Sequence, residues 1–174
     1  KQNQHEGGIS SPMIAHWPAG LKAEPGSITH QPGHLIDFMA TFLDVGKAKY
    51  PKQVGTRKVD PLMGKSLLPI LQGKERVGHE TLYFHFGTDR ALRQGSWKLV
   101  SAKLGRWELY NLDEDRTELN DLAATHPERV KAMAAKWFDL AENTERLKGK
   151  HLSPVKDTIK EIGFRKDTSN QLKK

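Results

Sequence analysis

The first 75 residues alternate short apolar runs with polar, Pro- and Gly-rich connections. Residues 9–17, ISSPMIAHW, follow two glycines and predict a short strand. Residues 32–46 predict a helix that begins near Pro32 and ends at Gly46, where a left-handed cap would lie. Its apolar face comprises Leu35, Ile36, Met39, Phe42 and Leu43. Residues 47–61 predict a surface connection, and residues 64–73, GKSLLPILQG, a short apolar turn or helix closed by Gly73.

Aromatic-rich runs separated by glycine turns dominate the next part of the chain. They are HETLYFHF from residue 79, RALRQGSWKLVSAK from residue 90 and RWELYNLD from residue 106. Trp97 and Leu99 flank Lys98, and Trp107 and Leu109 flank Glu108. Such alternation predicts a small antiparallel sheet with one buried face, onto which both tryptophans point as core residues.

A long helix is predicted from Thr125 to about Lys148. Thr125 and Glu128 have the spacing of a capping box, in which each side chain would bond the other residue's amide. One face of the helix is apolar and is expected to pack on the sheet; it comprises Val130, Met133, Ala134, Trp137 and Ala141.

These elements indicate an α+β fold, with a small antiparallel sheet packed on a long C-terminal helix. The strand and helix that precede the sheet cannot bury their apolar faces alone, so we expect them to belong to a larger α/β domain. We therefore predict that residues 1–73 are the incomplete C-terminal end of that domain. Residues 74–149 would form a sheet-plus-helix subdomain, and residues 150–174 a basic tail that we expect to be disordered.

Composition limits the function classes. The chain has no cysteine, which excludes disulfides and thiolate sites. No apolar run reaches the length of about 20 residues that a membrane span needs. The net charge is +7, and the tail from residue 150 holds seven Lys or Arg residues against three acidic ones. The tail would attract a polyanion, but Phe164 is its only aromatic residue, so we expect no nucleic-acid partner.

Five segments, in order, resemble the sulfatase (arylsulfatase) family of the alkaline-phosphatase-like superfamily. The first is K-x4-E-G-G-x-x-x-P-x-I-x-x-W-P at residues 1–18, and the second is H-x-x-D-x-x-A-T-x-x-x-x-x-G at residues 34–46. The others are GKSLLPILQG at 64–73, RALRQGSWKLV at 90–100 and WELYNLDEDRTELNDLA at 107–123. The resemblance covers residues 1 to about 148 and implies that residues 1–73 end a sulfatase catalytic domain.

The resemblance implies that Lys1, five residues before Glu6, is a catalytic residue that contacts the sulfate group. A lysine suits this role, because it is a compact cation that can also donate a proton to a leaving group. Gly7 and Gly8 would permit a tight backbone turn beside the site, and Glu6 would support that turn. His5 would either face the substrate or occupy surface.

The loop before the second strand resembles a part of the family that contacts the organic portion of the substrate. It carries His85, Asp89 and Arg90 as candidate substrate-binding residues. A surface ion pair of Arg90 with Asp89 or another acid is the alternative. His16 and His34 lie beside apolar positions, and we interpret them as structural.

The resemblance also implies a calcium ion and a formylglycine nucleophile in the intact enzyme. Neither the nucleophile motif, Cys/Ser-x-Pro-x-Arg, nor a calcium-ligand cluster is found in this sequence, so we expect no metal ligand in this chain. Asp113, Glu114 and Asp115 fit a solvated turn better than an oxygen cage. The expected partners are a sulfated small molecule or sulfated glycan and the missing N-terminal part of the catalytic domain. A periplasmic or secreted location is expected from the family.

The leading hypothesis is that the intact protein is a sulfuric ester hydrolase and that residues 1–174 alone are inactive. A phosphodiesterase or phosphonate hydrolase of the same superfamily, using a second metal ion, is one alternative. A non-catalytic polyanion-binding module is the other.

Overall fold

The computed structural model describes residues 3–145, and residues 1–2 and 146–174, including the basic tail, lie outside the described range. The described chain divides into two compact units. The sheet unit comprises residues 3–11 and 81–145, and the helical unit comprises Pro12–Glu80. Residues 3–11 thus belong to the sheet unit, and the predicted incomplete catalytic domain of residues 1–73 stays a prediction.

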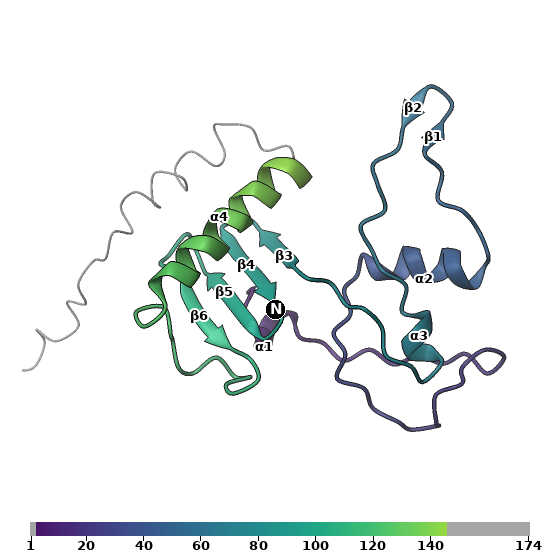
Figure 1. Cartoon of the computed structure of the whole chain (residues 1–174), viewed down its shortest axis with the longest axis horizontal. Coiled ribbons are helices and arrows are strands. Elements are labelled where there is room, and N and C mark those ends of the chain that lie inside the picture. Colours follow the sequence, from purple (N-terminus) through teal and green to yellow (C-terminus); the bar gives the residue numbers. More distant parts are fainter. Residues whose placement is uncertain (1–2, 146–174) are drawn as a thin grey trace, which may run out of the picture. The chain divides into compact units, whose positions relative to one another are not determined.

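The sheet unit contains the predicted antiparallel sheet, with strands in the order β3, β4, β5, β6 (Figure 1). Its strands are β3 (Leu82–Phe86), β4 (Asp89–Gln94), β5 (Trp97–Ser101) and β6 (Glu108–Asn111). Gly87 and Gly95 supply the positive φ angles, 58° and 60°, of the first two turns. In the register, Leu92 lies opposite Leu99, and Leu99 lies opposite Leu109.

Helix α4 (Pro127–Thr144) covers the face of the sheet that carries these leucines, as predicted (Figure 1). The predicted stripe is confirmed, with Met133, Ala134, Trp137 and Ala141 all buried. Trp107 is buried in the same core, and Trp97 packs against it. The sequence therefore predicted this half of the core correctly.

The predicted capping box is wrong. The cap residue of α4 is His126, and its side chain makes no capping hydrogen bond. The Thr125 hydroxyl instead donates to the carbonyl oxygen of Leu122 at 3.0 Å. Thr125 is thereby used by the preceding turn, and Pro127 at the first turn of the helix lacks an N–H that would need a cap.

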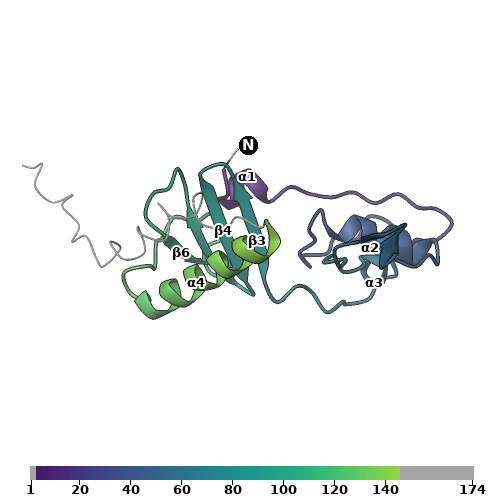
Figure 2. The same cartoon turned by 90° about the horizontal axis from the view of Figure 1, so that it is seen from above.

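The second face of the sheet is also covered, although the alternation predicted one buried face. Ala91, Val100, Tyr110 and Leu112 form a second buried cluster. The short helix α1 (Glu6–Ile9) lies on this side, opposite α4 (Figure 2). Lys98, which the alternation placed on the solvent side, is completely buried there.

The helical unit holds α2 (Asp37–Val45), the hairpin β1 (Gln53–Val54) and β2 (Arg57–Lys58), and α3 (Leu68–Leu71). Gly73 has a φ of 73° and follows α3, as predicted. At the end of α2 the left-handed residue is Lys47, with a φ of 51°, whereas Gly46 stays in the helical region, so the predicted cap is displaced by one residue.

The strand predicted at residues 9–17 is wrong for this chain, because residues 10–17 have no regular secondary structure. The two sheets of the described chain contain no strand beside this segment, and Pro12 has no N–H to donate. His16, which we interpreted as structural, is exposed. None of the helices within residues 3–145 has both the length and the apolar character that crossing a bilayer requires.

Candidate functional site

Lys1, the predicted catalytic residue, lies outside the described residues, and the segment from residue 3 onward packs on the sheet unit. We call residues 3–9 the anchor segment. The Ser10 amide donates to the carbonyl oxygen of Glu6 at 2.8 Å and closes the turn of α1. A Cβ on Gly8 would collide with the carbonyl oxygen of Asn3, whereas a Cβ on Gly7 would meet nothing within 4 Å. The expected close backbone approach therefore occurs at Gly8 alone.

Glu6 joins the anchor segment to the sheet. Lys98 Nζ donates to Glu6 Oε1 at 2.7 Å and lies 2.9 Å from Glu118 Oε1. The backbone amide of Glu6 donates to Glu118 Oε2 at 2.6 Å. The side chains of Lys98 and Glu118 are 0% and 3% exposed, so this ion-pair triad is almost free of solvent. Glu6 is thus bonded to the sheet unit, and its support of the active site stays a prediction.

His5 makes a second link between the anchor segment and the sheet. Its Nε2 lies 2.8 Å from Glu108 Oε2, and its Nδ1 lies 2.7 Å from Asn3 Oδ1. Glu108 also accepts a hydrogen bond from the Tyr110 hydroxyl at 3.0 Å. Burial, together with the neighbouring Glu108 carboxylate, raises the pKa of Tyr110. Tyr110 therefore stays a neutral donor at physiological pH.

Of the three residues predicted to bind substrate from the β3–β4 region, the structure brings two together and separates the third. His85 and Arg90 lie opposite each other in the register, and Asp89 points to the other face of the sheet. His85 Nδ1 lies 2.9 Å from the Glu145 carboxylate. Asp89 accepts a hydrogen bond from the backbone amide of Lys103 at 2.6 Å.

Arg90 is buried, with 2% of its surface exposed. Its guanidinium lies 4.5 Å from the Trp107 ring centre and 5.7 Å from that of Trp137, and it donates to Ser101 Oγ at 2.7 Å. Burial lowers the pKa of Arg90 to about 10, so it remains charged at neutral pH. The alternative of a surface ion pair with an acid is therefore wrong, and a substrate contact stays a prediction.

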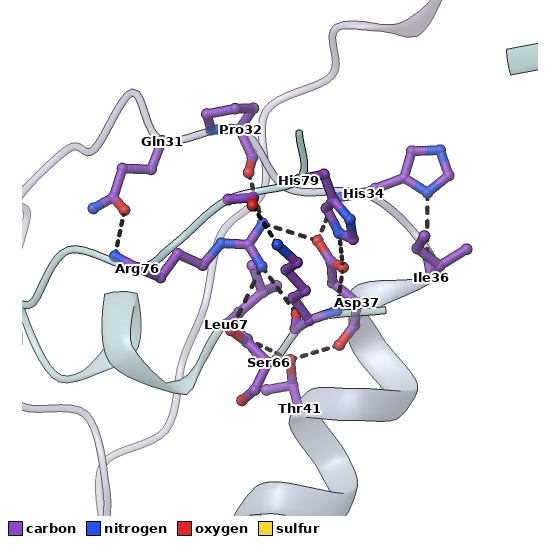
Figure 3. Close-up of polar contacts among 12 residues, drawn as sticks. Gln31, Pro32, His34, Ile36, Asp37, Thr41, Ser66, Leu67, Arg76 and His79 are labelled. Carbon is purple, nitrogen blue, oxygen red and sulfur yellow. Dashed lines mark hydrogen bonds and ion pairs between the residues drawn. The ribbon is translucent and has the colours of Figure 1, made fainter. Parts of the chain in front are cut away.

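A second polar centre, which the sequence did not single out, surrounds Asp37 in the helical unit (Figure 3). Asp37 is completely buried at the start of α2. Its carboxylate accepts from Arg76 Nη2 at 2.9 Å and lies 2.6 Å from His79 Nε2. The backbone amides of Lys65 and His34 donate to it at 2.8 Å and 2.9 Å.

The hydrogen bonds outweigh the effect of burial on Asp37. Burial alone would raise the pKa of this carboxyl, but the bonds from Lys65, His79, His34 and Arg76 lower it to about 2. Burial also lowers the pKa of the half-buried His34. Because every hydrogen-bond partner of Asp37 comes from the same unit, this centre ties α2 to the loops around α3.

The described residues do not fit a calcium site. Within residues 3–145, no group of three or more His, Asp or Glu side chains is arranged to hold a metal ion. Asp115 instead accepts hydrogen bonds from the amides of Leu119 and Asn120, as expected for the acidic turn. We therefore assign calcium no step that involves these residues.

Comparison with known proteins identifies the relatives of this chain. Residues 1–146 match the family model described as N-sulphoglucosamine sulphohydrolase, C-terminal. An uncharacterized sulfatase of Schizosaccharomyces pombe is 30% identical over 141 residues, which is 76% of this chain and 25% of that protein. The N-acetylgalactosamine-6-sulfatase of Mus musculus is 32% identical over 107 residues, 62% of this chain and 18% of that protein.

The fold is also found in a solved structure. The crystal structure of Ps i-CgsB superposes with a TM-score of 0.52 and 18% identity, covering 76% of this chain and 30% of that one. The chain thus spans a quarter or less of the length of these two curated relatives. The match of the family model across residues 1–146 shows that the chain belongs to the sulfatase family and corresponds to its C-terminal region.

Proposed function

We propose that the protein containing these residues hydrolyses sulfate monoesters and that Lys1 contacts the sulfate group. The observation that carries the proposal is the family match over residues 1–146, which includes Lys1 and the whole anchor segment. The cation of Lys1 would stabilise the charge that shifts onto oxygen as the S–O bond breaks. Its ammonium could also donate a proton to the leaving alcohol.

The anchor segment would orient this lysine. His5 and Glu6 are bound to the sheet unit through Glu108, Lys98 and Glu118. A catalytic group must be held close to its productive position, since small displacements cost much of the rate. In this proposal the C-terminal sheet supports the active site. His5 lies four residues after Lys1 and stays a candidate for substrate binding.

We further propose that the rest of the catalytic domain packs on α2. Leu35, Met39 and Phe42 are 76%, 53% and 69% exposed, although they form the apolar face predicted for this helix. A contiguous exposed apolar face such as this one is typical of a surface that packs against another part of a protein. The relatives are several times longer than this chain, so they contain enough additional polypeptide to provide one.

Formylglycine and calcium belong to the same proposal. The sequence lacks the nucleophile motif, and the described residues do not fit the metal, so both would be supplied by polypeptide outside residues 1–174. A sulfated glycan or a sulfated small molecule is the proposed substrate, and one relative is named N-acetylgalactosamine-6-sulfatase. A periplasmic or secreted location is proposed as well.

Turnover of paired esters tests the function. We expect the full-length protein to release sulfate from an aryl sulfate and to leave the matching aryl phosphate and bis-aryl phosphodiester largely intact. Residues 1–174 alone should release no sulfate, because the nucleophile motif is missing from them. Preferred hydrolysis of the phosphodiester would instead support the phosphodiesterase alternative, and sulfate release by residues 1–174 alone would contradict the proposed division of the site.

A further inference from the structure

A buried lysine on β5 connects the sheet to the anchor segment. Lys98 Nζ lies between Glu6 Oε1 at 2.7 Å and Glu118 Oε1 at 2.9 Å, and its side chain is 0% exposed. Its neighbours on this face include the apolar cluster of Ala91, Val100 and Tyr110. A charge in such surroundings requires close partners, and both of its carboxylate partners lie far away in the sequence.

Sheet packing alone does not explain a lysine at this position. A buried ion pair often adds no stability over an apolar residue of similar volume, whereas it does fix the geometry of the groups it joins. Here it joins a strand of the sheet to a four-residue helix that has no buried residue of its own. The anchor segment therefore has polar bonds, and little apolar packing, to keep it on the sheet.

Glu118 extends this connection. Its carboxylate lies 2.9 Å from Lys98 Nζ and accepts a hydrogen bond from the Glu6 amide at 2.6 Å, so it contacts both the side chain of Lys98 and the backbone of the anchor segment. Glu118 has a φ of 58°, a region that residues with side chains seldom adopt. In this conformation its carboxylate reaches both Lys98 and the Glu6 amide.

We propose that Lys98 and Glu118 form a clamp that positions the anchor segment, and through it Lys1, for sulfate-ester cleavage. This inference rests on the proposed function. Lys98 is a positioning residue, because it acts through Glu6 and touches no reacting atom. Glu118 is the second positioning residue, because it accepts the hydrogen bond from the amide of Glu6 at the start of α1.

The test compares Lys98→Met with Lys98→Arg and with Lys131→Met in the full-length protein. Methionine keeps the length of the lysine stem and removes its charge, and Lys131 is an exposed lysine on α4 that serves as the control. Hydrogen exchange of the peptide covering residues 3–11 reports release of the anchor segment, and exchange across β4 and β5 reports the sheet. kcat and KM on an aryl sulfate report catalysis.

For Lys98→Met we expect faster exchange in residues 3–11 with unchanged exchange across the sheet strands. We also expect kcat to fall about 10- to 100-fold, with a smaller change in KM, since a shift of about 1 Å in a catalytic group costs on the order of 100-fold. Lys98→Arg should show smaller changes in both exchange and kcat than Lys98→Met, and Lys131→Met should match wild type in both.

Glu6→Gln keeps the inference testable if Lys98→Met fails to fold, because Lys98 then retains Glu118 as its partner. Wild-type exchange and wild-type kcat in folded Glu6→Gln or Lys98→Met protein would overturn the clamp. If exchange is accelerated but the wild-type protein releases no sulfate, the clamp stands, and the proposed function fails together with the catalytic part of this inference.

Discussion

Buried charged residues define both polar centres of the described chain. Asp37 is enclosed by Arg76, His79 and two backbone amides, and Lys98 is enclosed by Glu6 and Glu118. In each case the charge is surrounded by groups of the opposite sign or by hydrogen-bond donors and acceptors, which is the condition for burying it. Removing one member leaves the others unpaired, so single substitutions should have large effects.

Asp37→Asn is expected to destabilise the helical unit by about 3 kcal/mol near neutral pH, because it leaves Arg76 without its buried partner. The pKa of Asp37 is lowered to about 2, below that of the unfolded chain, so its carboxylate stabilises the fold above about pH 4. This contribution, about 2 kcal/mol from the shift, is lost as the pH falls toward 2.

Urea unfolding at several pH values measures the difference between wild type and Asp37→Asn. The difference in unfolding free energy should narrow as the pH falls from about 5 to about 2, because residue 37 carries a titratable carboxyl in wild type and none in Asp37→Asn. Asp44→Asn, on the exposed side of the same helix, is the matched control and should change stability by less than about 0.5 kcal/mol. A gap between wild type and Asp37→Asn that does not depend on pH would contradict this account of Asp37.

Periodicity predicted the elements whose apolar residues pack on each other within this chain. The strands β3 to β6 and helix α4 lie where alternation and the 3.6-residue stripe placed them, because their partners are neighbours in the sequence. Alternation predicts which face of β5 carries Lys98. It does not predict that this face is covered, because Glu6, which binds Lys98, is 92 positions away in the sequence. The sequence carried no signal for that contact, nor for Glu118.

The errors have local causes as well. Thr125 has two possible hydrogen-bond partners of similar quality, and the preceding turn competes with the helix for its hydroxyl. A strand at residues 9–17 would need a neighbouring strand, which the described chain does not supply. The sequence identified Asp37 only as part of the motif at residues 34–46. Its ion pairs with Arg76 and His79 could not be predicted, because both partners are about 40 residues away in the sequence.

The two glycines of the anchor segment provide a matched pair of substitutions. Gly8→Ala should displace the segment, since its Cβ would collide with the backbone of Asn3. Gly7→Ala should be tolerated and even favour the helix slightly, because its Cβ meets open space. Exchange of the Ser10 amide, which is bonded to Glu6, should be accelerated only by Gly8→Ala. Equal exchange in the two variants would show that the close approach at Gly8 does not hold the segment.

The molecule as described consists of a well-packed sheet unit and a helical unit with an uncovered apolar helix face. Fold class and family could be predicted from the sequence, because five motifs and the element order agree with each other. The substrate could not be predicted, because under the proposed function part of the active site comes from polypeptide outside residues 1–174. The sheet unit contributes support: it holds His5 and Glu6 through side chains from two strands and a loop.

Sulfate release by the full-length protein and by its Lys1→Ala variant, at saturating aryl sulfate, tests the central claim most directly. We predict that wild type turns over and that kcat of the variant falls on the order of 100-fold or more, as for loss of one fixed charge-stabilising group. Circular dichroism and thermal unfolding should match between the two proteins. Equal kcat values would contradict the account, because the anchor segment would then position nothing that the reaction uses.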